Sequence, residues 1–387
     1  RDTRSSGVIL NQALNQGALD AGVKTFNLGV VSTPIIQYLS LKHRVYGAMI
    51  TASHNPASDN GIKILVNGSK TSLDEEIILE SYLKVDTLND LDFIPVEEDK
   101  SHIHEFLNAL ASLNFPVTDI NVFLDTAHGA LHEIAPQIIG KYANITGLIG
   151  NKPNGSNINA HVGSTHLKTL QKEKPMESIG LAFDGDGDRL IAMDESGNPV
   201  TGDQIIAIIN HYLNIDKKIV FTKMINPGII NALNNQTIKV IQTDIGDKYV
   251  LQEMNASNVL IGGEDSGHMI FKSVWPIGDG IISALLLLKV LHEQNIRLEE
   301  ATKQYPKYPE TLINIKNLTK ENYLNNNNLH TEIASLKTII EPHGKLLVRP
   351  SGTEPVIRTY LSMKDQKELD KYAHMLTELF ERYGGTL

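Results

Sequence analysis

The sequence predicts an α/β protein whose sheets are mixed or parallel, with a smaller α+β unit at the C-terminal end. Over most of the chain, short apolar runs typical of strands, such as Tyr46–Ile50 and Ile179–Phe183, alternate with helical patterns. This alternation predicts sheets that are covered by helices. The chain has 387 residues, more than one hydrophobic core usually organises, so we expect several units of about 100 residues each. After residue 308, three strand patterns and a closing helix predict the smaller unit.

The composition excludes several classes of protein. Hydrophobic residues make up 41% of the chain and charged residues 21%, and there is no cysteine. No apolar run approaches the roughly 20 residues that a membrane helix needs, and no signal-peptide pattern is visible. The net charge of −10 argues against a nucleic-acid partner, which requires a basic face. We therefore expect a cytoplasmic protein without a membrane or nucleic-acid partner.

The order of the patterns predicts four domains, at residues 1–113, 114–213, 214–307 and 308–387. In the first domain, residues 23–31 and Tyr46–Ile50 read as strands and residues 35–41 as a short helix. Ser72 and Glu75 form a capping box that predicts the start of another helix.

A candidate nucleophile lies in the stretch Thr-Ala-Ser-His-Asn-Pro at residues 51–56, directly after a predicted strand. Ser53 lies beside His54 and Asn55, and the following proline prevents a helix. This placement exposes the serine hydroxyl to a substrate. The alternative is an ordinary surface turn, because Ser, Asn and Pro are common turn residues.

A candidate metal site follows the predicted strand Ile179–Phe183. Asp184, Asp186 and Asp188 alternate with glycines, so in an extended backbone their carboxylates lie on one side. Two carboxylates about 4 Å apart repel by roughly 4 kcal/mol at an effective dielectric of 20, so three of them require a cation. Hard oxygen ligands suit Mg²⁺.

Two other interpretations of this acidic stretch exist. With Glu195 at the twelfth position, the spacing also matches a calcium-binding EF-hand loop. Arg189 occupies the position where that loop requires glycine, and the flanking segments read as strands instead of helices. A solvated acidic turn is the remaining alternative.

Two further loops carry candidate ligand-binding residues. Glu264, Ser266 and His268 alternate on a glycine-rich turn, and a carboxylate beside a hydroxyl and an imidazole suits a polyol; a plain glycine-rich hairpin is the alternative. Near the C-terminal end, residues 349–358 offer hydroxyls and backbone N–H groups between two arginines, which suits a phosphate. A rigid proline-bounded turn is the alternative there.

Together these loops predict an enzyme that moves a phosphoryl group on a sugar phosphate. Ser53 would carry the phosphoryl group, the metal held by the aspartates would neutralise its oxygens, and Lys63 and Arg189 would support the transition state.

The four stretches resemble those of the α-D-phosphohexomutase superfamily, over essentially the whole chain. The resemblance implies three similar α/β domains and a smaller C-terminal domain around a central cleft. It implies a phosphorylated Ser53, a bisphosphate sugar intermediate and Mg²⁺ held by Ser53 with the three aspartates. Lys63 and His268 are the candidates for proton transfer, and Arg189 completes the catalytic set. The candidate substrate-binding residues are His54, Asn55, Asp247, Glu264, Ser266, Arg349, Ser351, Gly352, Thr353 and Arg358.

Within the superfamily, the stretch Ile-Gly-Asp-Lys-Tyr-Val at residues 245–250 and the loop at residues 151–166 resemble the branch that acts on glucosamine phosphates. That branch implies the interconversion of glucosamine 6-phosphate and glucosamine 1-phosphate. The sequence Arg-Pro-Ser at residues 349–351, and Phe271 and Lys272 with Trp275, resemble the phosphomannomutase/phosphoglucomutase branch instead. Asp265 occupies a position where the glucosamine branch usually has glutamine. A monomer or a homodimer is expected.

Members of the superfamily open with a strand and a Gly-Ile-Arg-Gly-type segment before the stretch that Arg1–Arg4 resembles. Either the sequence is a fragment, or the first domain is expected to lack its N-terminal strand. A sugar-phosphate binding protein without catalytic activity is the alternative function.

Overall fold

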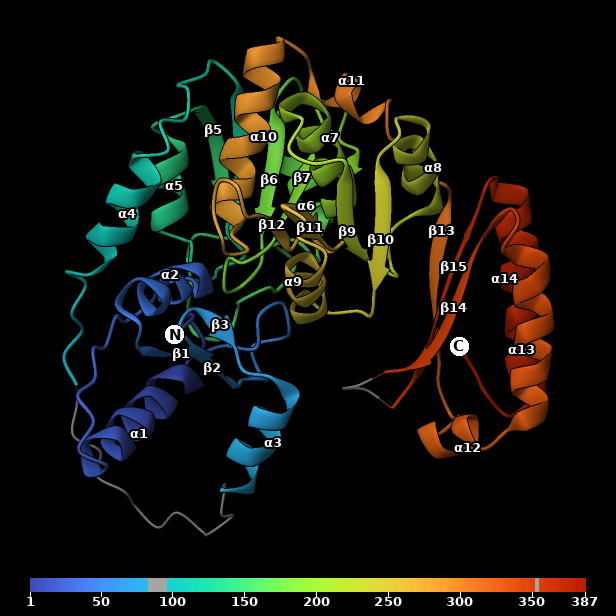
Figure 1. Cartoon of the computed structure of the whole chain (residues 1–387), viewed down its shortest axis with the longest axis horizontal. Helices are drawn as coiled ribbons and strands as arrows, with labels where there is room; N and C mark the ends of the chain where they lie inside the picture. Colours follow the sequence, from blue (N-terminus) through green and yellow to red (C-terminus); the bar gives the residue numbers. More distant parts are fainter. Residues whose placement is uncertain (83–95, 352–354) are drawn as a thin grey trace. The chain divides into compact units, whose positions relative to one another are not determined.

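A computed structural model describes residues 1–82, 96–351 and 355–387 (Figure 1). The chain forms two compact units, each described by itself below. Residues 1–224 and 238–303 form the first unit, and residues 225–237 and 304–387 form the second. The four-domain boundaries stay a prediction. No helix within the described ranges combines the length and the apolar character needed to cross a membrane.

The first sheet of the first unit is antiparallel, in the order β1-β2-β3 (Tyr46–Ile50, Ile62–Val66, Ser69–Lys70). Its neighbouring helices are α1 (Ser6–Asp20), α2 (Thr33–His43), α3 (Leu73–Ser81) and α4 (Ile103–Ala111). The predicted capping box is confirmed, because Ser72 and Glu75 exchange hydrogen bonds at the start of α3. Strand β1 delivers the serine loop, and Lys63 on β2 lies opposite Met49 on β1.

The predicted strand at residues 23–31 was wrong. Within the described residues, only an isolated bridge between Asn27 and Glu98 forms there. The Asn27 side chain instead accepts from Gly29 N and donates to the Val96 carbonyl. A β-strand requires a continuous partner, and apolar alternation alone does not supply one.

The second sheet carries the acidic stretch between two buried strands. Its order is β5-β4-β6-β7-β8, with β4 (Asn121–Asp125), β5 (Asn144–Ile149) and β6 (Ile179–Phe183) parallel. β7 (Leu190–Met193) and β8 (Pro199–Val200) continue the sheet antiparallel. α5 (Ile134–Ile139) and α6 (Leu167–Glu173) accompany it.

The EF-hand interpretation is excluded. The acidic stretch is the turn between strands β6 and β7, whereas an EF-hand requires flanking helices. Glu195 has a different role, because its carboxylate accepts from the backbone N–H groups of Leu298 and Glu299 at the start of α11 (Leu298–Thr302).

The third sheet has the order β10-β9-β11-β12. β9 (Lys218–Thr222), β10 (Lys239–Thr243) and β11 (Ile261–Gly263) are parallel, and β12 (Met269–Phe271) returns antiparallel to β11. The helices are α7 (Gly202–Leu213), α9 (Asp247–Ala256) and the almost wholly buried α10 (Gly280–Gln294). The glycine-rich turn that carries Glu264, Ser266 and His268 therefore connects β11 to β12 in a hairpin.

The second unit has its own hydrophobic core. Its antiparallel sheet has the order β13-β15-β14 (Glu310–Ile315, Ile357–Met363, Gly344–Pro350), and α13 (Asn327–Ile340) and α14 (Gln366–Arg382) pack on it (Figure 1). α8 (Pro227–Asn235) and α12 (Lys320–Leu324) complete the unit. Arg349 on β14 lies opposite Arg358 on β15. Gly352 and Thr353 of the predicted phosphate loop lie outside the described residues.

Candidate active site

The serine loop leaves β1 in a conformation that other parts of the chain support. Ser53 has a φ of 50°, in the left-handed region that non-glycine residues seldom adopt. Arg4 donates through Nη2 to the carbonyls of Ser53 (3.2 Å) and Asn55 (2.6 Å). Asn159 Nδ2 donates to the same two carbonyls, at 2.9 Å each. Two buried side chains therefore hold the serine in place.

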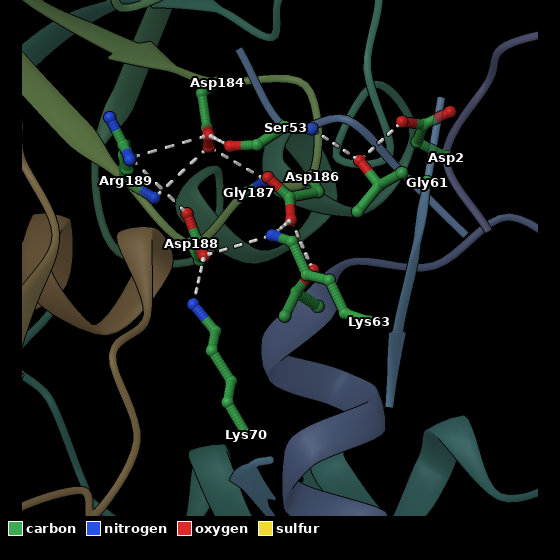
Figure 2. A network of polar contacts seen from close by, with 12 residues as sticks. Asp2, Ser53, Gly61, Lys63, Lys70, Asp184, Asp186, Gly187, Asp188 and Arg189 are labelled. Carbon is green, nitrogen blue, oxygen red and sulfur yellow. Dashed lines mark hydrogen bonds and ion pairs between the residues drawn. The ribbon is translucent and has the colours of Figure 1, made fainter. Parts of the chain in front are cut away.

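The Ser53 hydroxyl reaches the acidic stretch directly. Its Oγ donates to Asp184 Oδ2 at 2.6 Å. Each of Asp184, Asp186 and Asp188 supplies one carboxylate oxygen to a group in which all oxygens lie within 4.8 Å of one another. All three side chains are buried, and Figure 2 shows Ser53 beside Asp184.

The acidic turn holds its own shape through backbone donors. The N–H groups of Gly187 and Arg189 donate to Asp184 Oδ1, at 3.1 and 3.2 Å. At the start of α2, the Thr33 hydroxyl donates to Asp186 Oδ2 at 2.5 Å. The backbone N–H of Thr33 also donates to the Asp186 carbonyl, at 2.9 Å. The first turn of α2 therefore braces the triad.

Cationic side chains surround the three carboxylates (Figure 2). Lys63 Nζ lies 2.6 Å from Asp186 Oδ2 and 3.8 Å from Asp188 Oδ2. Arg189 Nε lies 4.0 Å from Asp184 Oδ2 and 3.9 Å from Asp188 Oδ1. Lys70 Nζ lies 3.8 Å from Asp188 Oδ2. The result is a compact cluster in which three buried carboxylates contact three partly exposed cations.

The shifted pKa values follow from this crowding. Burial, followed by the charges of Asp186 and Asp188, raises the pKa of Asp184 well above its usual value. Burial also disfavours the charged form of Asp188, but Lys63 and His268 outweigh it and lower the pKa of that carboxyl. Burial alone would lower the pKa of Lys63, whereas Asp186 and Asp188 raise it overall.

The triad fits a bound metal ion. Asp186 Oδ1 and Asp188 Oδ1 are buried and have no hydrogen-bond partner within the described part of the chain. Unsatisfied buried carboxylate oxygens are costly, and a divalent cation satisfies such oxygens. An all-oxygen donor set with a neighbouring serine hydroxyl suits a hard cation.

The hairpin turn at residues 264–268 lies against the same cluster. Leu190 N donates to the Gly267 carbonyl (3.0 Å), and Arg189 forms a β-bridge with His268. Glu264 Oε1 accepts from Gly246 N at 3.0 Å, which draws the start of α9 towards the turn. These backbone contacts join the loops of the second and third sheets.

His268 connects the triad to Asp247. Its Nδ1 lies 3.6 Å from Asp188 Oδ2, and its Nε2 lies 3.6 Å from Asp247 Oδ2. Burial opposes protonation of the imidazole, but Asp247 and Asp188 outweigh it and raise the pKa of His268. Lys70 forms an ion pair with Asp247, and it lowers the pKa of that carboxyl against the effect of burial.

The other residues predicted to bind the substrate lie in different parts of the structure. His54 follows Ser53, and burial together with Arg189 lowers its pKa to about 4, which favours the neutral imidazole at neutral pH. Asn55 Nδ2 donates to Asp59 Oδ2 (3.1 Å), within its own loop. Ser266 lies on the hairpin turn.

Three predicted phosphate-binding residues belong to the second unit, namely Arg349, Ser351 and Arg358. Their part in the site stays a prediction.

Sequence reasoning missed several residues that build the site, namely Arg4, Thr33, Lys70 and Asn159. Thr33 stood in a Ser-Thr-Pro sequence typical of a helix start, and that pattern indicated a helix without indicating its partner. Asn159 lies in the loop at residues 151–166, whose sequence indicated a branch of the superfamily but no contact with Ser53. For Lys70 the sequence held no signal, because its partner Asp247 is 177 positions away.

The Ser53 hydroxyl contacts buried aspartates that suit a metal ion, and cationic side chains lie beside them. This arrangement is typical of a site for phosphoryl transfer. Comparison with known proteins narrows this class. Family models of phosphoglucomutase/phosphomannomutase match the chain as α/β/α domain I at residues 1–89, α/β/α domain III at residues 201–308 and the C-terminal domain at residues 295–379. The chain belongs to the phosphoglucomutase/phosphomannomutase family and is a phosphohexomutase-type isomerase.

Curated relatives and solved structures agree with this family. Phosphoglucosamine mutase of Staphylococcus saprophyticus is 37% identical, over 98% of this chain and 88% of the relative. Phosphoglucosamine mutase of Bacillus pumilus is 39% identical, over 100% of this chain and 89% of the relative.

The solved structures share the fold at lower identity. A phosphoglucomutase/phosphomannomutase family protein from Burkholderia thailandensis has a TM-score of 0.76 at 20% identity, covering 99% of this chain and 88% of its own. Aspergillus fumigatus N-acetylphosphoglucosamine mutase, solved with GlcNAc-6P and magnesium, has a TM-score of 0.66 at 16% identity, covering 97% and 99%.

Proposed function

We propose that this chain is a phosphoglucosamine mutase, which interconverts glucosamine 6-phosphate and glucosamine 1-phosphate through a phosphoserine at Ser53. The observation that carries the proposal is the 2.6 Å hydrogen bond from Ser53 Oγ to Asp184 of the triad. It holds the nucleophilic oxygen beside carboxylates and cations that suit a phosphoryl group. Curated phosphoglucosamine mutases that match nearly the whole chain support the choice of substrate.

Each half-reaction transfers one phosphoryl group. A sugar hydroxyl attacks the phosphorus carried on Ser53, so that a new P–O bond to the sugar forms while the P–O bond to the serine breaks. The sugar then carries two phosphates. After it reorients, the serine oxygen takes the other phosphoryl group and the isomerised monophosphate is released.

The aspartates would hold Mg²⁺ together with an oxygen of the serine phosphate. When bound, this ion supplies charge neutralisation to the phosphoryl oxygens. Two oxygens without hydrogen-bond partners, on Asp186 and Asp188, support this assignment within the described residues. Arg189 and Lys63 then provide further positive charge beside the same carboxylates.

Lys63 and His268 differ in how well they suit proton transfer. Asp186 and Asp188 favour the ammonium form of Lys63, which supports negative charge better than it accepts a proton. His268 is also favoured in its protonated form, which suits it to give a proton to a leaving oxygen. Proton transfer is therefore assigned to His268 in preference to Lys63.

The sugar would lie on the hairpin turn. Glu264 and Ser266 would bind its hydroxyls, with His54 and Asn55 on the facing serine loop. The backbone N–H of Gly246, directly before Asp247, donates to Glu264 Oε1 at 3.0 Å. The Glu264 carboxylate attracts the ammonium of an amino sugar more than a neutral hydroxyl, since opposite charges gain more at low dielectric.

The non-reacting phosphate would be held by the second unit. Arg349 and Arg358 lie opposite each other on β14 and β15, and burial followed by the charge of Arg358 lowers the pKa of Arg349. The guanidinium fork of arginine matches the oxygens of a phosphate, so this pair suits a phosphate group. Ser351, Gly352 and Thr353 would complete this cradle. A cytoplasmic location and a monomeric or homodimeric state remain predictions.

A coupled assay tests the proposed function. Glucosamine 6-phosphate, mannose 6-phosphate and glucose 6-phosphate are compared as substrates, with Ser53→Ala as the control. We expect the highest kcat/KM for glucosamine 6-phosphate and no turnover in the variant. The purified protein should also carry about 80 Da of phosphate that Ser53→Ala lacks.

Other outcomes identify the alternatives. A preference for mannose or glucose phosphate would indicate the phosphomannomutase/phosphoglucomutase activity. Binding of sugar phosphates without turnover or phosphoserine would indicate a non-catalytic binding protein.

A further inference from the structure

A second group of metal-ligating side chains lies on the first unit, outside the aspartate triad. It consists of His43, His102 and Glu105, and one ligand atom from each lies within 4.8 Å of the other two. His43 is the last residue of α2, His102 immediately precedes α4, and Glu105 lies in the first turn of α4. Two helices therefore present imidazole nitrogens and a carboxylate to one point. We call these three residues the His43 cluster.

The distances within the His43 cluster are close to those of a metal site. His43 Nε2 lies 3.2 and 3.1 Å from the two oxygens of Glu105, and His102 Nδ1 lies 2.8 Å from Glu105 Oε1. Tetrahedral Zn²⁺ with bonds of about 2.0–2.2 Å separates its ligand atoms by roughly 3.4 Å. The two imidazole nitrogens would therefore each move away from Glu105 by roughly 0.2–0.6 Å.

The helices that carry the cluster are fixed against each other. Tyr38 on α2 and Phe106 on α4 meet edge to face at 5.7 Å, and both rings contact Trp275. The His102 ring also packs edge to face on the ring of Phe26, with 5.0 Å between the ring centroids. The ligands are thus held by aromatic packing, which lowers the ordering cost of binding an ion.

The charge state of the cluster also suits a cation. His102, Lys42 and His43 all contact Glu105 and lower its pKa to about 2, so the carboxylate is ionised at neutral pH. Lys42 Nζ lies 2.6 Å from Glu105 Oε2 and is the present counter-ion. The Lys42 side chain is 42% exposed, so it can leave into solvent when a divalent ion replaces it.

We propose that His43, His102 and Glu105 form a binding site for a borderline divalent cation such as Zn²⁺, with an open position for water. Two imidazoles and one carboxylate are a donor set that Zn²⁺ prefers and Mg²⁺ does not. The ion would connect the C-terminal end of α2 to α4. Because Thr33 at the other end of α2 braces Asp186, the ion would stiffen the helix that supports the triad.

The test is a titration of the full chain with Zn²⁺ in excess Mg²⁺, which occupies the aspartate triad. Calorimetry should show one equivalent of Zn²⁺ bound. His43→Gln, His102→Gln and Glu105→Gln should each weaken binding at least about tenfold, because losing even an outer-sphere partner of a metal costs this much. His104→Gln is the matched control, since it changes an exposed histidine on the same turn of α4.

Two further measurements sharpen the result. Co²⁺ in place of Zn²⁺ should give the visible absorption of a tetrahedral site, and this absorption should vanish in the three cluster variants. Lys42→Met should tighten Zn²⁺ binding severalfold, because it removes the cation that competes for Glu105. Circular dichroism with a chelator checks that each variant is folded.

Two results would overturn the proposal. One is an affinity for Zn²⁺ that the three cluster variants leave unchanged. The other is a loss of affinity in His104→Gln equal to theirs, which would indicate unspecific binding to surface histidines.

Discussion

At the residue scale, the serine loop depends on side chains that donate to its carbonyls. Asn159→Ala removes both donations to Ser53 and Asn55, worth about 1 kcal/mol each. We expect kcat to fall about thirtyfold, since about 2 kcal/mol of positioning is lost. Steady-state kinetics measures this effect. Asn157→Ala, in the same loop, is the control, and an equal fall in both variants would show that the loop as a whole, and not the Ser53 contact, limits turnover.

A second prediction at this scale concerns Asp125, which is fully buried at the end of β4. Its carboxylate accepts from Ala127 N and Gly163 N, but burial outweighs these bonds and raises its pKa from 3.8 to about 6. The folded state therefore binds this proton more tightly than the unfolded state does. The resulting stabilisation is fully present below about pH 4 and is lost as the pH rises through about 6.

Asp125→Asn isolates this contribution, because the amide does not titrate. The free energy of unfolding of the wild type, relative to the variant, should decrease by about 3 kcal/mol between about pH 4 and pH 7.5. Urea unfolding at several pH values measures the difference. A difference that stays constant with pH would contradict the raised pKa.

At the scale of elements, the turn of the β11–β12 hairpin packs closely against Leu190, which follows the acidic turn. Gly267 has a φ of 96°, and a Cβ there would lie 2.3 Å from the Leu190 carbonyl oxygen. Gly267→Ala should displace the turn that carries Glu264 and raise KM at least about tenfold, because substrate contacts are lost. Steady-state kinetics with glucosamine 6-phosphate provides the measurement.

Gly197→Ala is a matched control for this substitution. Gly197 has a φ of 88°, but the nearest atom to its added Cβ is 3.7 Å away. Both variants carry the same backbone strain, of about 1–2 kcal/mol, and only Gly267→Ala creates a close contact. Equal kinetic changes in the two variants would attribute the effect to strain alone.

At the scale of the whole molecule, the sequence predicted the strands that are buried on both faces and the turns between them. β6 and β7 with their acidic turn are an example, since continuous apolar runs leave little alternative. The strand predicted at residues 23–31 was wrong, because apolar alternation within one segment does not show whether a partner strand lies beside it. Arg4, Lys70 and Asn159 were missed because their partners are distant in sequence, and tertiary contacts alone give such residues a role.

The two compact units lead to a final prediction about metal removal. The triad belongs to the first unit, whereas the second unit has its own core around β15, α13 and α14. A ligand stabilises only the folded unit that binds it, by about 2.7 kcal/mol at a hundredfold excess over its Kd. Calorimetry should therefore show a transition that Mg²⁺ shifts upward and a separate one that it leaves unchanged.

Two comparisons test whether the calorimetric shift comes from Mg²⁺ at the triad. KCl at equal ionic strength should not reproduce the shift, because screening acts weakly on buried charges. Asp184→Asn combined with Asp186→Asn should abolish the shift, because two of the three carboxylates that would hold the ion are lost. If Mg²⁺ moves both transitions equally, or if the double variant responds like the wild type, the ion does not bind at the triad.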